Sequence, residues 1–241
     1  MVYDLEPLKM ACRNIDIELT DAQLSMFFSY YDKLMEKNKV MNLTTITELD
    51  EVIEKHFLDS LFLVKGIDLS KINTIIDVGT GAGFPGIPLK IVFPHLNIVL
   101  MDSLKKRLKF LDDIILDFGL TGIKTVHGRA EDLGQMALYR EQFDLCVSRA
   151  VSNLSTLSEY CLPFVKQEGY FISYKSGDID AELKEADKAI SVLGGGTAEV
   201  ILFTLPKSES LRSFVKIKKV KHTPKLYPRQ AGTPNKEPIK K

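Results

Sequence analysis

The first 70 residues carry apolar side chains at the spacing of helices. After Thr20 and Asp21, a polar pair typical of a helix N-terminus, apolar residues recur every three or four positions, at Leu24, Phe27, Phe28, Tyr31, Leu34 and Met35. A second helical pattern begins at about Leu49. We therefore predict an N-terminal helical extension over residues 1–70, and we interpret the aromatic stripe as a core contact rather than a cofactor surface.

From Ile72 the pattern changes to short apolar runs that alternate with amphipathic segments. The runs predict strands at residues 73–78, 97–102, 123–128, 143–149, 169–175, 198–205 and 213–220. Helices are predicted near residues 85–93, 104–118, 132–139, 153–165 and 178–193. This alternation is typical of an α/β fold with a mostly parallel sheet covered on both faces. The last two strands have no helix between them and predict an antiparallel edge hairpin. We assign residues 71–220 to this domain.

A glycine-rich stretch follows the first predicted strand, at the edge where such sheets bind ligands. The letters GAGFPG, residues 81–86, match the pattern GxGxxG, which alone is a weak signal. A tight strand-to-helix turn without a ligand would need the same glycines, and so would a loop around the pyrophosphate of a dinucleotide.

Asp77 distinguishes between these ligands. It ends the first strand just before the glycine run, so a pyrophosphate would meet a like charge there. At 4 Å and an effective dielectric near 20, that repulsion is worth roughly 4 kcal/mol per charge pair. A ligand that carries an ammonium and a sulfonium group gains from the same carboxylate. Asp77 therefore favours S-adenosylmethionine, bound by a loop that includes Gly79, Gly81 and Gly83.

The next two strands end in residues that suit an adenosine. Asp102 and Ser103 follow the second strand, where an acid can accept the ribose hydroxyls, although NAD would also require that acid. Ala130, Glu131 and Asp132 follow the third strand, where the adenine base would lie. Together with Asp77, these residues predict a methyltransferase, with a dehydrogenase as an alternative.

Charge is distributed unevenly along the chain. The net charge is zero, but residues 216–241 hold nine Lys or Arg residues against one acid, Glu237. We predict a basic C-terminal tail over residues 221–241, which is either solvated or in contact with nucleic acid.

Other composition signals exclude whole classes of protein. Cys12, Cys146 and Cys161 are scattered and the four histidines stand alone, so we predict no disulfide framework and no metal. Apolar runs are far shorter than the ~20 residues of a membrane span, and the N-terminus does not resemble a signal peptide. We expect a cytoplasmic protein that does not bind membranes.

Several motifs together resemble one family, the RsmG (GidB) family of small-subunit ribosomal RNA guanine-N7 methyltransferases. The motifs are KVMNLTTI, HFLDSL, DVGTGAGFPGIPLKI, LMDSLKKRLKFL, GRAED, FDLCVSRAV and YPRQAGTPNKEPI. The resemblance implies a class I (Rossmann-like) methyltransferase fold with a helical N-terminal extension. It also implies methyl transfer to N7 of a single guanine in the decoding-region loop of 16S rRNA. By motif, the implied cofactor contacts are Gly79, Phe84, Ala130, Glu131 and Arg149.

The residues after the fourth strand agree with this class of target atom. They read SRAVSN, without the Asn/Asp-Pro-Pro-aromatic run of amino-methyltransferases, and Cys146 should point into the sheet. Guanine N7 already has a lone pair, so we expect no general base and a positioning role for Arg149. Small-molecule N-methylation and a non-catalytic RNA or ribosome assembly factor remain alternatives.

RNA binding should use cations near the predicted cleft and in the tail. The candidates are Lys105, Lys106, Arg107, Lys175, Lys225 and Arg229. The expected partner is 16S rRNA or the small ribosomal subunit, including an assembly intermediate, and we expect a monomer.

Overall fold

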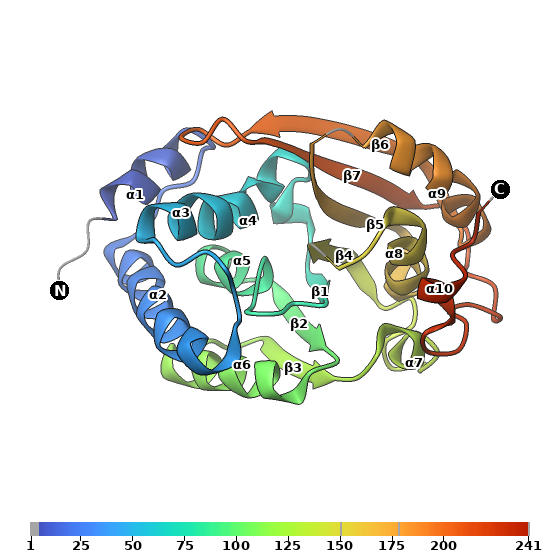
Figure 1. Cartoon of the computed structure of the whole chain (residues 1–241), viewed down its shortest axis with the longest axis horizontal. Coiled ribbons are helices and arrows are strands. Elements are labelled where there is room, and N and C mark those ends of the chain that lie inside the picture. Colours follow the sequence, from blue (N-terminus) through green and yellow to red (C-terminus); the bar gives the residue numbers. More distant parts are fainter. Residues whose placement is uncertain (1–4, 150, 178, 241) are drawn as a thin grey trace.

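A seven-stranded sheet forms the centre of the computed structural model, which describes residues 5–149, 151–177 and 179–240. The strands lie in the order β3-β2-β1-β4-β5-β7-β6 (Figure 1). Their bounds are β1 Thr74–Val78, β2 Asn97–Asp102, β3 Ile123–His127, β4 Phe143–Arg149, β5 Val165–Ser176, β6 Gly195–Thr204 and β7 Leu211–Lys219. Strands β1 to β5 pair in parallel, and β7 is antiparallel to both β5 and β6. The mostly parallel sheet with an antiparallel edge hairpin is therefore confirmed.

Helices cover both faces of this sheet. Their bounds are α1 Glu6–Arg13, α2 Asp21–Met41, α3 Leu49–Val52, α4 Asp59–Leu61, α5 Gly86–Val92, α6 Lys105–Asp117, α7 Ala130–Leu133, α8 Leu154–Cys161, α9 Asp180–Val192 and α10 Thr233–Lys236. The prediction of a helix over residues 132–139 was wrong: α7 begins at Ala130 and is a single turn that ends at Leu133. The helix predicted over 153–165 ends at Cys161, and β5 begins at Val165. The predicted start of α9 at residue 178 lies outside the described residues.

Both helices predicted for the N-terminal extension are present, and the second is interrupted by a non-α turn. Thr20 and Gln23 make reciprocal side-chain and backbone hydrogen bonds at the start of α2, as the polar pair predicts. The second helix is not regular: a π-helical turn at Ile53–Leu58 separates α3 from α4, and a 3₁₀ turn follows at Phe62–Lys65. Such π turns are rare in proteins, and those that occur often lie at functional sites.

Alternating residues of the central strands enter two different cores. Ile75 and Leu100 pack with α1, α2, α5, α6 and the segment from residue 52 to 63, whereas Ile76 and Met101 pack with α7, α8 and α9. The aromatic stripe of α2 belongs to the first core, with Phe27, Tyr30 and Leu34 fully buried, so its interpretation as core is confirmed. The helical extension therefore shares one hydrophobic core with the sheet.

The segment predicted as a basic tail packs against the second face. It runs along α8 on the side of the molecule opposite to the N-terminal helices (Figure 1). Ser155 and Thr156 of α8 donate hydrogen bonds to the carbonyls of Ile239 and Pro234, at 2.6 and 3.1 Å. No helix among the described residues is both long enough and apolar enough to span a bilayer.

Candidate functional site

The glycine loop follows β1, beside the point between β1 and β4 where the order of the strands reverses. Gly79 and Gly83 have φ values of +72° and +101°, which side chains rarely adopt. A Cβ on Gly79 would lie 2.6 Å from Cγ2 of Val151, and one on Gly83 would lie 2.7 Å from the hydroxyl of Tyr30. Glycine is therefore required at both positions by conformation and by space.

Asp77 lies beneath this loop and is fully buried. Its Oδ2 accepts hydrogen bonds from the Thr80 hydroxyl at 2.7 Å and from the Gly86 N–H at 3.0 Å. Its buried Oδ1 has no hydrogen-bond partner among the described residues. Burial raises the pKa of Asp77 to about 6, against the lowering effect of those two hydrogen bonds. Because the carboxylate is fully buried, it lies beneath the loop rather than on an open surface that a ligand could contact.

Asp102 ties the second strand to the glycine loop. Its Oδ2 accepts the Gly81 N–H at 3.0 Å, and its Oδ1 accepts the Leu104 N–H at 2.8 Å. Arg107 approaches the same carboxylate at 3.4 Å. Asp102 and Gly79 line one cavity together with Ser103, Arg107, Ala130, Glu131 and Tyr160. Four of the five residues expected around an adenosine thus lie together, whereas Asp132 lines a separate cavity beside the C-terminal segment.

The C-terminal segment contacts Glu131, one of the residues that line this cavity. Glu131 Oε1 accepts the backbone N–H of Gly232 at 2.8 Å. Glu159 of α8 accepts three hydrogen bonds from Arg229, at 2.8 Å from its backbone N–H, 3.0 Å from Nε and 2.7 Å from Nη2. The charge of Arg229, one of the expected RNA contacts, is therefore already compensated within the protein.

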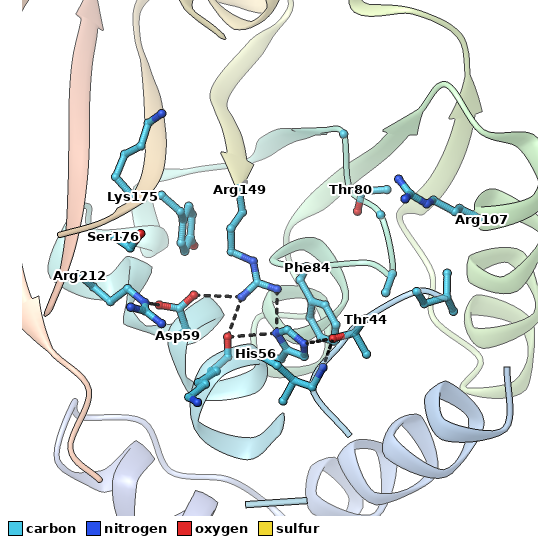
Figure 2. A pocket seen from close by; sticks show the side chains of 17 residues that line it. Thr44, His56, Asp59, Thr80, Phe84, Arg107, Arg149, Lys175, Ser176 and Arg212 are labelled. Carbon is cyan, nitrogen blue, oxygen red and sulfur yellow. Dashed lines mark hydrogen bonds and ion pairs between the residues drawn. The ribbon is translucent and has the colours of Figure 1, made fainter. Parts of the chain in front are cut away.

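A second cavity adjoins the first, and both are lined by Gly79 and Arg107. It lies between the end of β4, the loop before α3 and the segment with the π turn. Figure 2 shows Arg149 pointing between Asp59 and His56, while Arg212 approaches Asp59 from the other side. Its charged and aromatic lining consists of Lys55, His56, Asp59, Phe84, Arg107, Arg149, Tyr174, Lys175 and Arg212.

Arg149 is fixed from three directions. Its Nη1 donates to Asp59 Oδ2 at 2.9 Å and to the Lys55 carbonyl at 3.0 Å, and its guanidinium lies 5.0 Å above the Phe84 ring. The His56 ring stacks on the same Phe84 ring at 4.6 Å. Burial, and then the charge of Arg149, lower the pKa of His56 to about 3, so this imidazole is neutral at physiological pH.

The expected RNA contacts are divided between two places. Arg107 and Lys175 line the second cavity, where Lys175 pairs with Glu182 at 2.7 Å. Lys105 and Lys106 are exposed on the first turn of α6, and Lys225 is exposed in the C-terminal segment. The described residues hold no group of three or more His, Cys, Asp or Glu arranged for a metal ion.

Sequence reasoning assigned no role to His56, Asp59 or Arg212. His56 and Asp59 stand three positions apart in HFLDSL, a spacing that places both on one face of a helix, so a local signal was present. Arg212 lies at the start of β7, between β5 and β6 in the sheet, and carries no such signal, because only the pairing of β7 with β5 brings it to the cavity.

The residues of the first cavity fit S-adenosylmethionine. Asp102 and Ser103 line it with oxygen atoms suited to ribose hydroxyls, and the unpaired Oδ1 of Asp77, buried beneath the adjoining loop, favours a cationic ligand nearby.

Solved structures share the fold at low sequence identity. A SAM-dependent O-methyltransferase from Thermotoga maritima is 17% identical and aligns with a TM-score of 0.52 over 79% of this chain and 73% of that chain. A SAM-dependent methyltransferase from Aquifex aeolicus is 16% identical, with a TM-score of 0.52 over 73% of this chain and 97% of that chain. The predicted class I methyltransferase fold is confirmed.

Closer relatives match the chain from end to end. A ribosomal RNA small subunit methyltransferase G from Lachnoclostridium phytofermentans is 52% identical over 94% of both chains. The protein of that name from Listeria monocytogenes is 47% identical over 97% of this chain and 98% of its own. A profile of the GidB family, described as rRNA small subunit methyltransferase G, matches residues 23–211. Fold and family both agree with S-adenosylmethionine as the cofactor. The chain belongs to the GidB family of rRNA small subunit methyltransferases.

Proposed function

We propose that this protein transfers the methyl group of S-adenosylmethionine to N7 of a single guanine in the decoding-region loop of 16S rRNA. The observation that carries the proposal is the pair of adjoining cavities that meet at Gly79. One has the residues for an adenosine, and the other is lined by cations from five separate parts of the chain. The names of the relatives, which are rRNA small subunit methyltransferases, support RNA as the substrate.

In this proposal the loop residues Gly79, Gly81, Gly83 and Phe84 hold the methionine end of the cofactor. Asp102 and Ser103 bind the ribose, and Ala130 and Glu131 bind the adenine. When bound, S-adenosylmethionine supplies an electrophilic methyl group on a sulfonium. Asp77 contributes negative charge beneath the loop, which stabilises the cationic end of the ligand.

The second cavity would receive the target base. Guanine N7 has a lone pair and no proton, so its alkylation requires position rather than a base. The neutral His56 ring contacts Thr44 at 2.8 Å and Arg149 at 3.3 Å. It does not act as a general base in this proposal, because N7 has no proton to remove. Arg149 then acts by orienting the base and the cofactor, and a base extruded from its loop would enter beside the Phe84 ring.

The surrounding cations would bind the RNA backbone. Lys105, Lys106, Arg107 and Lys175 are proposed contacts near the cavity, and Lys225 is a proposed contact on the C-terminal segment, where the charge of Arg229 is already paired with Glu159. The partner is 16S rRNA within the small subunit or one of its assembly intermediates.

Mass spectrometry of 16S rRNA fragments from cells with and without the gene tests the proposal. We expect one guanine in the decoding-region loop to lose a methyl group at N7 when the gene is deleted. Purified protein with labelled S-adenosylmethionine should restore it on naked rRNA or on small subunits from the deletion strain. Methylation of another atom would contradict the guanine-N7 assignment, and cofactor binding without any methyl transfer would indicate an assembly factor.

A further inference from the structure

We propose that Tyr30, in helix α2 of the N-terminal extension, is a positioning residue that holds the glycine loop in the shape that binds the cofactor. The inference rests on the proposed binding of S-adenosylmethionine at this loop. It assigns to the helical extension a role in the cofactor site, in addition to its packing in the core.

The side chain of Tyr30 reaches the loop from 52 positions away in the sequence. Its ring is fully buried, and its hydroxyl donates a 2.5 Å hydrogen bond to the carbonyl of Ala82. Burial raises the pKa of Tyr30 well above its usual value, so the phenol keeps the proton that it donates. The contact is therefore a buried hydrogen bond at the centre of the loop, with the phenol as donor.

The Tyr30 ring also packs against Phe84, the aromatic residue of the loop. Tyr30 lies 5.4 Å from the Phe84 ring, and it stacks at 5.6 Å on Phe57 from the segment with the π turn. Phe84 is contacted in addition by His56 and Arg149. Phe84 thus lies between α2 and the residues of the second cavity.

The peptide that Tyr30 holds by its carbonyl is also held by its N–H, because Gly83 N–H donates to the Thr80 carbonyl at 2.9 Å. Ala82 lies between Gly81 and Gly83, which are the most conformationally free residues in the chain and both have positive φ. The Gly81 N–H points to Asp102, so a rotation of the neighbouring peptide would disturb the link between the loop and the ribose carboxylate. Without Tyr30, the Ala82 carbonyl would be buried without this partner and would favour other loop conformations.

The test is Tyr30→Phe, which keeps the ring and removes the hydroxyl. We expect the dissociation constant for S-adenosylmethionine, measured by calorimetry, to rise about tenfold. The KM for the cofactor should rise by the same factor, while kcat at saturating cofactor and the affinity for RNA stay within about twofold. A role in stability alone would lower the melting temperature without this separation of KM from kcat.

Two matched variants of α2 serve as controls. Tyr31→Phe removes a hydroxyl that donates to the Thr47 carbonyl at 2.9 Å, away from the glycine loop, and should leave cofactor affinity unchanged. Phe27→Leu weakens a buried contact with Phe57 and should lower stability without changing cofactor affinity in the folded protein. All variants are measured at a temperature at which near-ultraviolet circular dichroism shows them to be folded.

Each outcome separates this inference from the proposed function. If the unmodified protein does not bind S-adenosylmethionine, the proposed function fails, and this inference fails with it. If the unmodified protein binds the cofactor and folded Tyr30→Phe binds it within twofold, only the role of Tyr30 is overturned. An equal loss of affinity in Phe27→Leu would also overturn it, because general loosening of α2 would then be the cause.

Discussion

Asp59 and Arg149 form an ion pair at 2.9 Å across 90 positions of sequence, joining the N-terminal extension to the end of β4. Asp59 is almost fully buried and also lies 3.5 Å from Nε of Arg212. One carboxylate therefore balances two guanidinium groups, which stay charged at every relevant pH. The pair fixes the residue that we propose to position cofactor and base.

Asp59→Asn should impair both stability and turnover. Removal of the charge leaves Arg149 and Arg212 facing each other, so we expect a loss of about 2 kcal/mol in the free energy of unfolding and roughly 10- to 100-fold in single-turnover rate. Chemical denaturation and a single-turnover assay measure the two effects. Asp68→Asn is the control, because its pair with Lys71 is exposed and should matter little. Unchanged values for Asp59→Asn would contradict the role of this pair.

Asp77 should make cofactor binding sensitive to acid. Its pKa of about 6 in the folded protein is above the usual value, so its contribution to stability is present below about pH 4 and disappears as the pH rises through 6. A cationic ligand favours the ionised form, so affinity for S-adenosylmethionine should fall as the pH is lowered from 7 to 5. Asp77→Asn should bind about 1–3 kcal/mol more weakly at pH 7.

Calorimetry across this pH range checks the prediction. The Asn variant should lose the pH dependence between pH 5 and 7 and should remain folded, because an amide can still accept the Thr80 and Gly86 hydrogen bonds. Parallel pH curves for the two proteins would mean that Asp77 does not sense the ligand.

Arg229 and Lys225 should separate stability from RNA binding within the C-terminal segment. Arg229→Gln leaves Glu159 buried without its cation, and we expect a loss of about 3 kcal/mol in the free energy of unfolding. Lys225 is exposed, so Lys225→Gln should leave stability within about 0.5 kcal/mol. If Lys225 contacts a phosphate, the log–log salt slope of RNA binding should fall by about one. Denaturation curves and salt titrations distinguish the two residues, and an unchanged slope would exclude the Lys225 contact.

Methyl transfer should be nearly independent of pH between 7 and 9. N7 has no proton to lose, and His56, with a pKa of about 3, does not titrate in this range. The measurement is a single-turnover pH series at saturating cofactor and RNA. His56→Gln should lose less than about 100-fold in rate, as expected for a stacking residue. A bell-shaped profile, or a ~10⁴-fold loss with both ligands still bound, would show that a proton moves in the reaction.

Short-range patterns in the sequence determined many of the helices and strands of this protein and the position of its glycine loop. The change from helical to strand periodicity at Ile72, the glycine loop and the acids that end β1 and β2 all depend on neighbours within a few residues. Because parallel strands bring their carboxyl ends to one edge, the sequence also predicted that Asp77, Asp102 and Glu131 come together there. The meeting of Asp102 and Glu131 in one cavity could be predicted for this reason, whereas Asp77 is buried beneath the loop and lines neither of the two cavities.

Only the tertiary structure decided the contacts between distant segments. The ion pair of Asp59 with Arg149, the approach of Arg212 and the hydrogen bond from Tyr30 to Ala82 each join side chains that have no local relation. The sequence predicts that the basic segment at the C-terminus is either solvated or in contact with nucleic acid, yet Arg229 enters a buried pair because α8 presents Glu159 to it. Periodicity specifies which face of an element is buried, whereas the partner of a buried charge or hydroxyl is set by how the elements pack.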